Sequence, residues 1–584
     1  MCTPTPRAAG LRRCLANVLL AGAALAQALG GQAATPAAPL PPNPNALPDI
    51  ICRVGGPDAL GFTTSVKLLS GLGSYKLPIA TRVPQAQKFF DQGLVLTWAF
   101  NFAEAGRSFR EAARLDPQCA MCLWGIAYAL GPSINHDMDE AASAAAYEAI
   151  SRAQLLAHNA PPKERALITA LATRYAADVK APRLPLDWAY GKAMRALVAQ
   201  YPDDADVLTL AAEAEMDLHP HDYWERDGTP QPWTPAIIEL LERALAKSPN
   251  HPGANHYLIH MLEYSPTPER GLAAAERLAS LAPNAGHLVH MPAHLYLRLG
   301  RYHDAVQANR AAIAGDGAYL REAAADPAYA TGYLMHNYHF LWSAALMAGE
   351  RNVALEAARA LADGSKTDAV AGPRAATAQH FVVLPLYTQV RFGQWAEILA
   401  APAPVPSTPY TRAAWHYARG MAFARAGDIK RARTESIALD VEARRPELGK
   451  LLFKNTNPLS AFAAIASLQL RAEIAAAAGD PKTAVRHARE AFAREAKLEI
   501  DEPPAWHQPL RHTLGAALLG AKRPAEAEAV YRADLALNPE NGWALAGLAA
   551  SLRAQGRAAE ADAVDARLAR AWAAADVKIT ASQF

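Results

Sequence analysis

Histidines concentrate between positions 256 and 339, and their spacing could build a metal site. Eight of the 18 histidines in the 584-residue chain fall in this stretch, which is about a seventh of its length. Seven of them form three groups on segments with helical patterning, and intervals of three or four residues place the members of a group on one helix face. Because imidazole is the commonest transition-metal ligand, the groups predict a mono- or dinuclear site. The predicted ligands are His256, His260, Glu263, His287, His290, His294, His336 and His339.

The predicted ligand atoms are typical of transition-metal sites but do not identify the metal ion. Imidazoles with one carboxylate and no nearby thiolate suit copper, zinc, iron or nickel, and the affinity order alone favours copper. Glu263 could be a ligand or a general base. Catalysis would also need an open coordination position, so the sequence leaves enzymatic activity undecided. The alternative is a metal-free polar seam, in which the histidines bond to one another, to Glu263 or to tyrosines.

The elements that carry these residues are predicted to be stacked helical hairpins. Small and aromatic residues recur at the spacing of the roughly 34-residue tetratricopeptide repeat, in which Gly and Ala let two helices approach and an aromatic ring fills the gap. The clearest units contain Gly93, Ala105, Phe109, Ala112 and Pro117 near the start, and Gly515, Leu518, Ala527, Tyr531 and Pro539 near the end. No stretch predicts a strand. The fold class is therefore all-α, a tetratricopeptide-type solenoid with the histidine groups on the inner helices of its concave face.

Two details of this arrangement stay open in the sequence. Pro292 lies between His290 and His294 and lacks a backbone donor. Either the helix kinks there, or it begins near Pro292 and leaves His287 and His290 on an incoming loop. The segment 217–224 gathers acidic, imidazole and aromatic side chains around a proline, and we expect a solvated turn, with a cap over the groove as the alternative. We expect His303 at the surface.

Composition divides the chain into six parts. Basic residues up to Arg13, an apolar stretch from Leu15 to Leu29 and small residues after it are typical of a cleavable signal. We therefore expect export to the periplasm or beyond, by the general secretory route rather than the twin-arginine route. We expect no later stretch to be long and apolar enough to span a bilayer. The predicted parts are a signal (1–33), a Pro/Ala-rich linker and irregular lead-in (34–84), an amino-terminal array (85–400), a Pro-rich linker (401–409), a carboxyl-terminal array (410–575) and a tail (576–584).

Charge and cysteine content limit the partners and the compartment. The formal net charge is +2 and no basic run occurs, so the footprint of a nucleic-acid binder is missing. The alternative function is a metal-free scaffold that binds a peptide or protein partner in its concave groove. Cys52, Cys119 and Cys122 would remain after signal cleavage, and their pairing is open. For Cys119 and Cys122 we favour a structural disulfide or plain helix packing over redox activity.

The chain also resembles a family of exported bacterial tetratricopeptide proteins with a histidine signature. The resemblance covers roughly residues 86 to 345 and is most specific from Gly286 to Tyr296. It implies a solenoid and joins the histidines into one motif, but it implies no activity. Where relatives are expected to have Asn-His, this chain has Asn101 and Phe102, so no ligand is expected there. The stretches that carry it are 109–112, 116–121, 124–125, 255–260, 286–294 and 336–340.

Overall fold

Helices make up nearly all of the regular structure. The computed structural model describes residues 66–225, 227–323, 329–499 and 501–584, so the predicted signal and Cys52 lie outside the described residues. The helices are α2 (Pro84–Trp98), α3 (Phe102–Leu115), α4 (Ala120–Ala129), α5 (Glu140–Leu156), α6 (Pro162–Ala172), α7 (Arg183–Gln200), α8 (Ala205–Leu218), α9 (Thr234–Lys247), α10 (Pro252–Leu262), α11 (Leu272–Leu281), α12 (Gly286–His290), α13 (Pro292–Arg298), α14 (Tyr302–Glu322), α16 (Met335–Ala348), α17 (Arg351–Ser365), α18 (Ala375–Arg391), α19 (Trp395–Ala400), α20 (Pro409–Arg425), α21 (Ile429–Ala443), α22 (Leu459–Ala477), α23 (Pro481–Glu495), α24 (Leu510–Gly520), α25 (Pro524–Leu537), α26 (Gly542–Ala554) and α27 (Ala558–Ala571).

The hairpins pack as the repeat pattern predicts. Phe109 of α3 fills the space left by two glycines, because a Cβ on Gly93 or Gly125 would lie 2.7 or 2.3 Å from its ring. Tyr531 of α25 stands in the same relation to glycines sixteen residues before and after it, in α24 and α26. Identical packing at both ends of the array confirms the all-α, tetratricopeptide-type solenoid.

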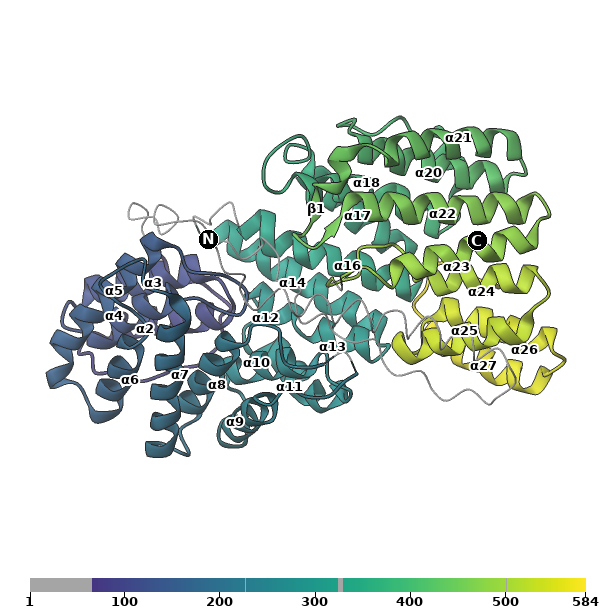
Figure 1. Ribbon diagram of the computed structural model, residues 1–584. Helices are drawn as coiled ribbons and strands as arrows, with labels where there is room; N and C mark the ends of the chain where they lie inside the picture. The colour runs from purple at the N-terminus through teal and green to yellow at the C-terminus, as the bar shows by residue number, and fades with distance from the viewer. Residues whose placement is uncertain (1–65, 226, 324–328, 500) are drawn as a thin grey trace, which may run out of the picture.

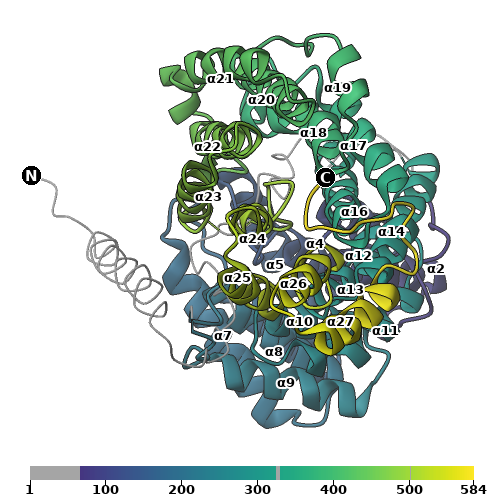
Figure 2. The same cartoon turned by 90° about the vertical axis from the view of Figure 1, so that its right-hand side faces the viewer.

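The array winds so that its last helices meet its middle ones. Figure 1 shows α10 to α16 between the amino-terminal helices and the green and yellow carboxyl-terminal ones, and Figure 2 shows the C terminus among the helices. The indole of Trp543 in α26 donates to the carbonyl of Leu346 in α16 at 2.9 Å. Asp576, beyond α27, accepts from the first amides of α17. The middle helices are therefore held from both sides.

Three of the four helices that carry the converging histidines, α10, α12 and α13, share a small apolar cluster with α2 and α11. Ile259 of α10, Leu288 of α12 and Leu295 of α13 are fully buried there together with Val95 of α2. Pro252 occupies the first turn of α10, where no amide donor is needed, and His251 caps that helix by accepting from the amide of Ala254. The apolar face of each helix thus turns the histidine-bearing face toward a common centre.

Three findings differ from the sequence predictions or qualify them. A two-residue antiparallel pair, β1 (Leu452–Phe453) with β2 (Asn457–Pro458), joins α21 to α22, although no strand is predicted. The helix α22 is long and apolar enough to cross a membrane, so the expectation of no such stretch is wrong; 67% of its apolar window is buried inside the protein. The division into two arrays stays a prediction, because one buried cluster has members on both sides of residues 401–409.

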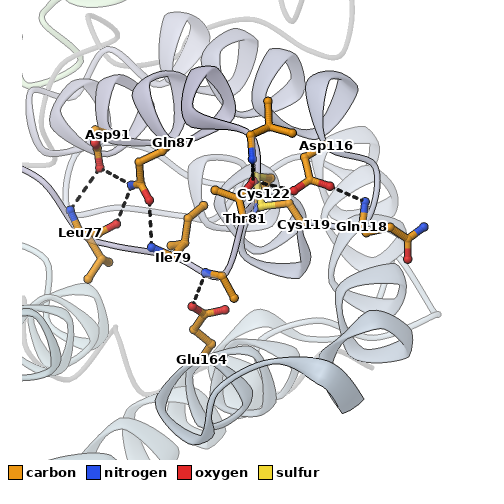
Figure 3. The surroundings of a disulfide bond; sticks show 12 residues. Leu77, Ile79, Thr81, Gln87, Asp91, Asp116, Gln118, Cys119, Cys122 and Glu164 are labelled. Carbon is orange, nitrogen blue, oxygen red and sulfur yellow. Dashed lines mark hydrogen bonds between the residues drawn. A yellow bond between two sulfur atoms is a disulfide. The ribbon is translucent and has the colours of Figure 1, made fainter.

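Cys119 and Cys122 form a disulfide at the start of α4, as Figure 3 shows. Cys119 is the N-cap residue of the helix, and its sulfur accepts from the amide of Cys122 at 3.1 Å. The neighbouring hydrogen bonds tie the segment before α2 to Asp91 of α2, to Asp116 at the end of α3 and to Glu164 of α6. The preferred structural role of this pair agrees with that setting at a helix start.

Candidate metal centre

Six histidines converge in two groups of three on four helices. The first group is His256 and His260 of α10 with His287 of α12, and the second is His290 of α12, His294 of α13 and His336 of α16. Within each group one nitrogen from every ring lies within 4.8 Å of the others. The groups adjoin, since the ring centroids of His287 and His290 are 6.0 Å apart and those of His260 and His294 are 6.1 Å apart.

The first group is centred on the Nε2 atom of His256. This atom lies 3.1 Å from Nε2 of His260 and 3.1 Å from Nε2 of His287. His256 is fully buried, and the other two rings are at most 5% exposed. Three imidazoles therefore direct the same ring nitrogen at one small volume.

The second group repeats this arrangement around α13. Nε2 of His290 lies 3.0 Å from Nε2 of His294, and the ring of His336 packs edge-on against His290 at 4.8 Å. A π-helical turn at Ala330–Leu334 leads into α16 and places Tyr333 against His287. Such turns are frequent at functional sites because they re-aim the side chains that follow.

Pro292 interrupts the hydrogen-bond ladder without ending the helical path. Only Met291 separates α12 from α13, and its φ of −51° and ψ of −36° are helical. His287 and His290 are themselves helical, so the alternative that places them on an incoming loop is wrong. The break lets α12 contribute to both groups while α13 contributes His294 to the second.

A second layer of acceptors fixes the orientation of four rings. Nδ1 of His256 donates to the carbonyl oxygen of Trp98 at 2.6 Å, and Nδ1 of His290 donates to Oδ1 of Asn309 at 2.8 Å. The side-chain amide nitrogen of Asn309 donates to the carbonyl oxygen of Ala305, so the side-chain oxygen of Asn309 faces the histidine. Acceptors of this kind hold the tautomer and the ring plane of metal-ligating histidines.

Glu263 joins the two groups. Its Oε1 atom lies 3.0 Å from Nδ1 of His260, and its Oε2 atom lies 2.7 Å from Nδ1 of His294. The carboxylate thus orients one ring in each group, which is an outer-layer position for both sets of Nε2 ligands. A third candidate group consists of Glu263, His294 and Glu502, whose Oε2 atom is 3.2 Å from Nδ1 of His294.

Burial and neighbouring charges set the protonation of the rings. Burial lowers the pKa of His256, His287, His290 and His336 well below the usual value, and adjacent imidazoles lower it further, so these rings are neutral at neutral pH. Burial also lowers the pKa of His294, but the carboxylates of Glu263 and Glu502 outweigh it and raise the value to about 10. Burial raises the pKa of Glu263, yet the histidines outweigh it and hold that pKa below its usual value.

Two phenyl rings cover the groups. Phe100 lies 4.7 Å from His256 and stacks on His260 and His287, while Phe340 lies 4.5 to 4.8 Å from all three rings of the second group. Phe100 has a φ of +56°, a conformation that costs a side-chain-bearing residue about 1 kcal/mol or more. The strained backbone places an apolar wall directly against the first group.

Not every predicted ligand joins the centre. His339 lies in neither group, and its buried ring packs against Trp342 and Phe381. His303 has a half-exposed side chain paired with Glu350, as expected of a surface residue.

The segment 217–224 is not the solvated turn that we expect. Tyr223 and Trp224 are buried, the indole of Trp224 donates to the carbonyl of Met261 in α10, and Asp217 pairs with Arg174. Its neighbours on α8 and α10 cover it, and no local pattern signals that burial. The segment supports the helix that carries His256 and His260.

Glu502 and Phe100 also lie at the centre, and residue spacing does not predict either of them. Glu502 comes from the segment between α23 and α24, more than two hundred residues after His294, and no spacing links the two. Phe100 precedes Asn101, the N-cap of α3, so it falls in the turn between the first two helices. That position beside a helix cap is the only local signal, and it does not identify a ring over a metal site.

Comparisons with known proteins identify no family for this chain. No protein-family model and no curated protein matches the chain. Among solved structures, a human IFIT1 dimer with m7Gppp-AAAA has 12% identity and a TM-score of 0.28 over 85% of this chain and 92% of that one. The P58(IPK) TPR domain has 15% identity and a TM-score of 0.20 over 75% and 98%, and Naa15/Naa10 bound to HypK-THB has 13% and 0.22 over 83% and 71%. At these TM-scores the overlays carry no functional argument, and the expectation of no nucleic-acid binding stays a prediction.

Proposed function

We propose that the chain binds two transition-metal ions, one in each group of three histidines. The observation that carries this proposal is the pair of facing Nε2 atoms of His256 and His260. Nδ1 of His256 faces a carbonyl oxygen and Nδ1 of His260 faces a carboxylate, and both of these partners can only accept. In its neutral form, each of these rings has its proton on Nδ1 and its lone pair on Nε2.

Two lone pairs at 3.1 Å need a positive charge between them. A polar seam would instead pair a donor with an acceptor, which is the arrangement that buried polar groups require. A metal bound tetrahedrally with metal–nitrogen distances near 2.0–2.1 Å would hold its ligand nitrogens about 3.3 Å apart. The observed separations of 3.1, 3.1 and 3.0 Å are close to that value, and the other nitrogen pairs within each group lie within 4.8 Å.

The donor set agrees with copper, zinc or iron. Neutral imidazoles suit all three, and copper binds most strongly in the affinity order. Three protein ligands per ion is also the number found in catalytic zinc sites, where the fourth position holds water or substrate. We propose metal-dependent chemistry at these open positions, either by polarising a bound substrate or by redox change of copper or iron.

Elemental analysis of the purified protein tests the proposal. After exposure to copper, zinc or iron and removal of loose metal, we expect two ions per chain. His260→Ala should lose the ion of the first group, whereas His303→Ala, a helical histidine outside both groups, should lose none. Circular dichroism confirms that each variant keeps its helices.

Fewer than about 0.1 equivalents of every metal in the folded wild-type protein would overturn the proposal. That result would favour the alternative function, a metal-free scaffold with a peptide or protein partner in its groove.

We also propose that the protein works in the periplasm or outside the cell. The signal-like first 33 residues support export, and the Cys119–Cys122 disulfide suits an oxidising compartment. Fractionation of cells that express the full chain, with sequencing of the mature amino terminus, tests this. Recovery of the uncleaved chain in the cytoplasm alone would exclude it.

A further inference from the structure

An aromatic cluster connects the first histidine group with the surface of the protein. Trp98, at the end of α2, is fully buried, and its ring lies 4.8 Å from the ring of Tyr75 and 4.6 Å from that of His251. Gly253 of α10 makes room for the indole, because a Cβ there would lie 2.9 Å from it. The ring of Tyr75 is half-buried, so the cluster reaches solvent at that residue.

The inner end of the cluster is bonded to the proposed metal ligand. The carbonyl oxygen of Trp98 accepts from Nδ1 of His256 at 2.6 Å, and Nε2 of the same ring is at the centre of the first group. A metal bound at Nε2 would therefore be linked to the indole through one imidazole, one hydrogen bond and the tryptophan itself.

The outer end of the cluster places a proton acceptor against the phenol of Tyr75. The phenol of Tyr75 donates to Asp206, and Nε2 of His251 lies 3.3 Å from the same carboxylate. Burial raises the pKa of Asp206, but hydrogen bonds from His251 and Tyr75 outweigh it and leave the pKa below its usual value, so the group is an anionic acceptor at neutral pH. Loss of an electron from a phenol makes its proton strongly acidic, and here an acceptor is already in place.

We propose that Tyr75 and Trp98 form an electron relay between solvent and a copper or iron ion in the first histidine group. The inference rests on the proposed function, because it needs that ion. With hydrogen peroxide as oxidant, copper(I) gives one electron and becomes copper(II), and the Tyr75 phenol gives the second electron through Trp98. Peroxide takes both electrons and two protons to become two waters, with one proton from the phenol by way of Asp206 and one from solvent. The product on the protein is a neutral tyrosyl radical.

Electron paramagnetic resonance on the copper-loaded protein tests the relay. Copper content is first measured in the full-length wild type and in each variant, the copper is reduced, and a small excess of hydrogen peroxide is added before rapid freezing. We expect a tyrosyl signal in the wild type and its loss in Tyr75→Phe. Trp98→Phe keeps the carbonyl that holds His256 but removes the indole, so it should keep its copper and lose or delay the radical.

Tyr147→Phe is the matched control, since Tyr147 is exposed and belongs to α5. It should give the wild-type signal. A copper-loaded wild type that forms no tyrosyl radical, or a radical of equal yield in Tyr75→Phe, would overturn the relay and leave the metal site standing. Failure to retain either copper or iron would remove the relay before peroxide is added, whereas only failure to retain every one of copper, zinc and iron would remove the proposed function as well.

Discussion

Four imidazoles of the centre have Nδ1 held by an acceptor, and in the neutral rings of His256 and His290 this leaves Nε2 bare. The acceptors are a carbonyl for His256, an amide oxygen for His290 and one shared carboxylate for His260 and His294. A positive charge is needed between the facing Nε2 atoms. Protonation of His256 or His287 would supply it only at high cost, because burial lowers the pKa of both rings. At the scale of the residue, the structure is therefore more like a set of preoriented ligands than a hydrogen-bonded seam.

Glu263→Gln should weaken metal binding in both groups. The amide that replaces the carboxylate has a single acceptor oxygen, so only one of the two Nδ1–H groups can keep its partner. Loss of such an outer-layer acceptor typically lowers affinity about 10–100-fold. Competition with a chelator of known affinity measures the change, and Glu239→Gln, an exposed glutamate of α9, is the control. An unchanged affinity in both groups would mean that Glu263 does not orient the ligands.

The pH should change the affinity of the second group more than that of the first. His294 has a pKa near 10 in the metal-free protein, so at neutral pH a metal must displace its proton. The apparent affinity should then rise by about tenfold per pH unit and level off near pH 10. His256→Ala leaves only the second group and His336→Ala only the first, and titrations of both variants at several pH values separate the two curves. A flat curve for the second group would contradict this protonation state.

The sequence predicts which histidines share a helix face but not what stands behind them. Spacing alone groups His256 with His260 and predicts a stripe, and the structure has that stripe. The partner of His256 is a backbone carbonyl 158 residues earlier in the chain, which has no side-chain signature. His339 shares the spacing of His336, but it turns toward Phe381, because three residues on a helix still leave a rotation of about 60°.

At the scale of the element, the repeat spacing predicts helices and their contacts well because one packing rule repeats. Phe109 and Tyr531 occupy equivalent gaps between glycines at opposite ends of the chain. Where a segment departs from the rule, local composition misleads: the segment 217–224 looks like a solvated turn, yet it is covered by α10. Local sequence is equally insufficient at Pro292. It allows either a kinked helix or an incoming loop before the proline, and the packing of α12 determines which of the two forms.

Phe109→Ala should destabilise the amino-terminal helices. The ring fills the gap between α2, α3 and α4, and its removal leaves a cavity that the glycines cannot close. Phenylalanine-to-alanine changes at fully buried positions typically cost about 3–5 kcal/mol. Chemical denaturation monitored by circular dichroism should show an earlier first transition, whereas Tyr147→Ala at an exposed position should have little effect. Equal midpoints for the two variants would argue against this role of the ring.

At the scale of the whole molecule, the centre draws on parts of the chain that the sequence keeps far apart. Trp98 and Phe100 come from the first hairpin, the converging histidines come from the middle helices, and Glu502 comes from the segment between α23 and α24. The sequence predicts repeats but not the small rotation from each repeat to the next, and that rotation decides which distant segments meet. This explains why the convergence of the histidines could be predicted and the approach of Glu502 could not.

Removal of residues 576–584 should loosen the contact between the last and the middle helices without emptying the metal site. Asp576 caps α17, Ser582 bonds to Tyr531 and to the carbonyl of His512, and Phe584 packs against Gly393. Loss of the cap alone costs about 0.5–2 kcal/mol, so the thermal midpoint should fall. Metal content should stay at the wild-type level, because no residue of the tail belongs to either histidine group. Gln583→Ala within the same tail is the control and should leave the midpoint nearly unchanged. An unchanged thermal midpoint in the truncated protein would show that the tail does not hold the array together. Loss of metal from the truncated protein would show that the middle helices alone do not keep the six imidazoles in place, and that the winding of the whole chain is needed.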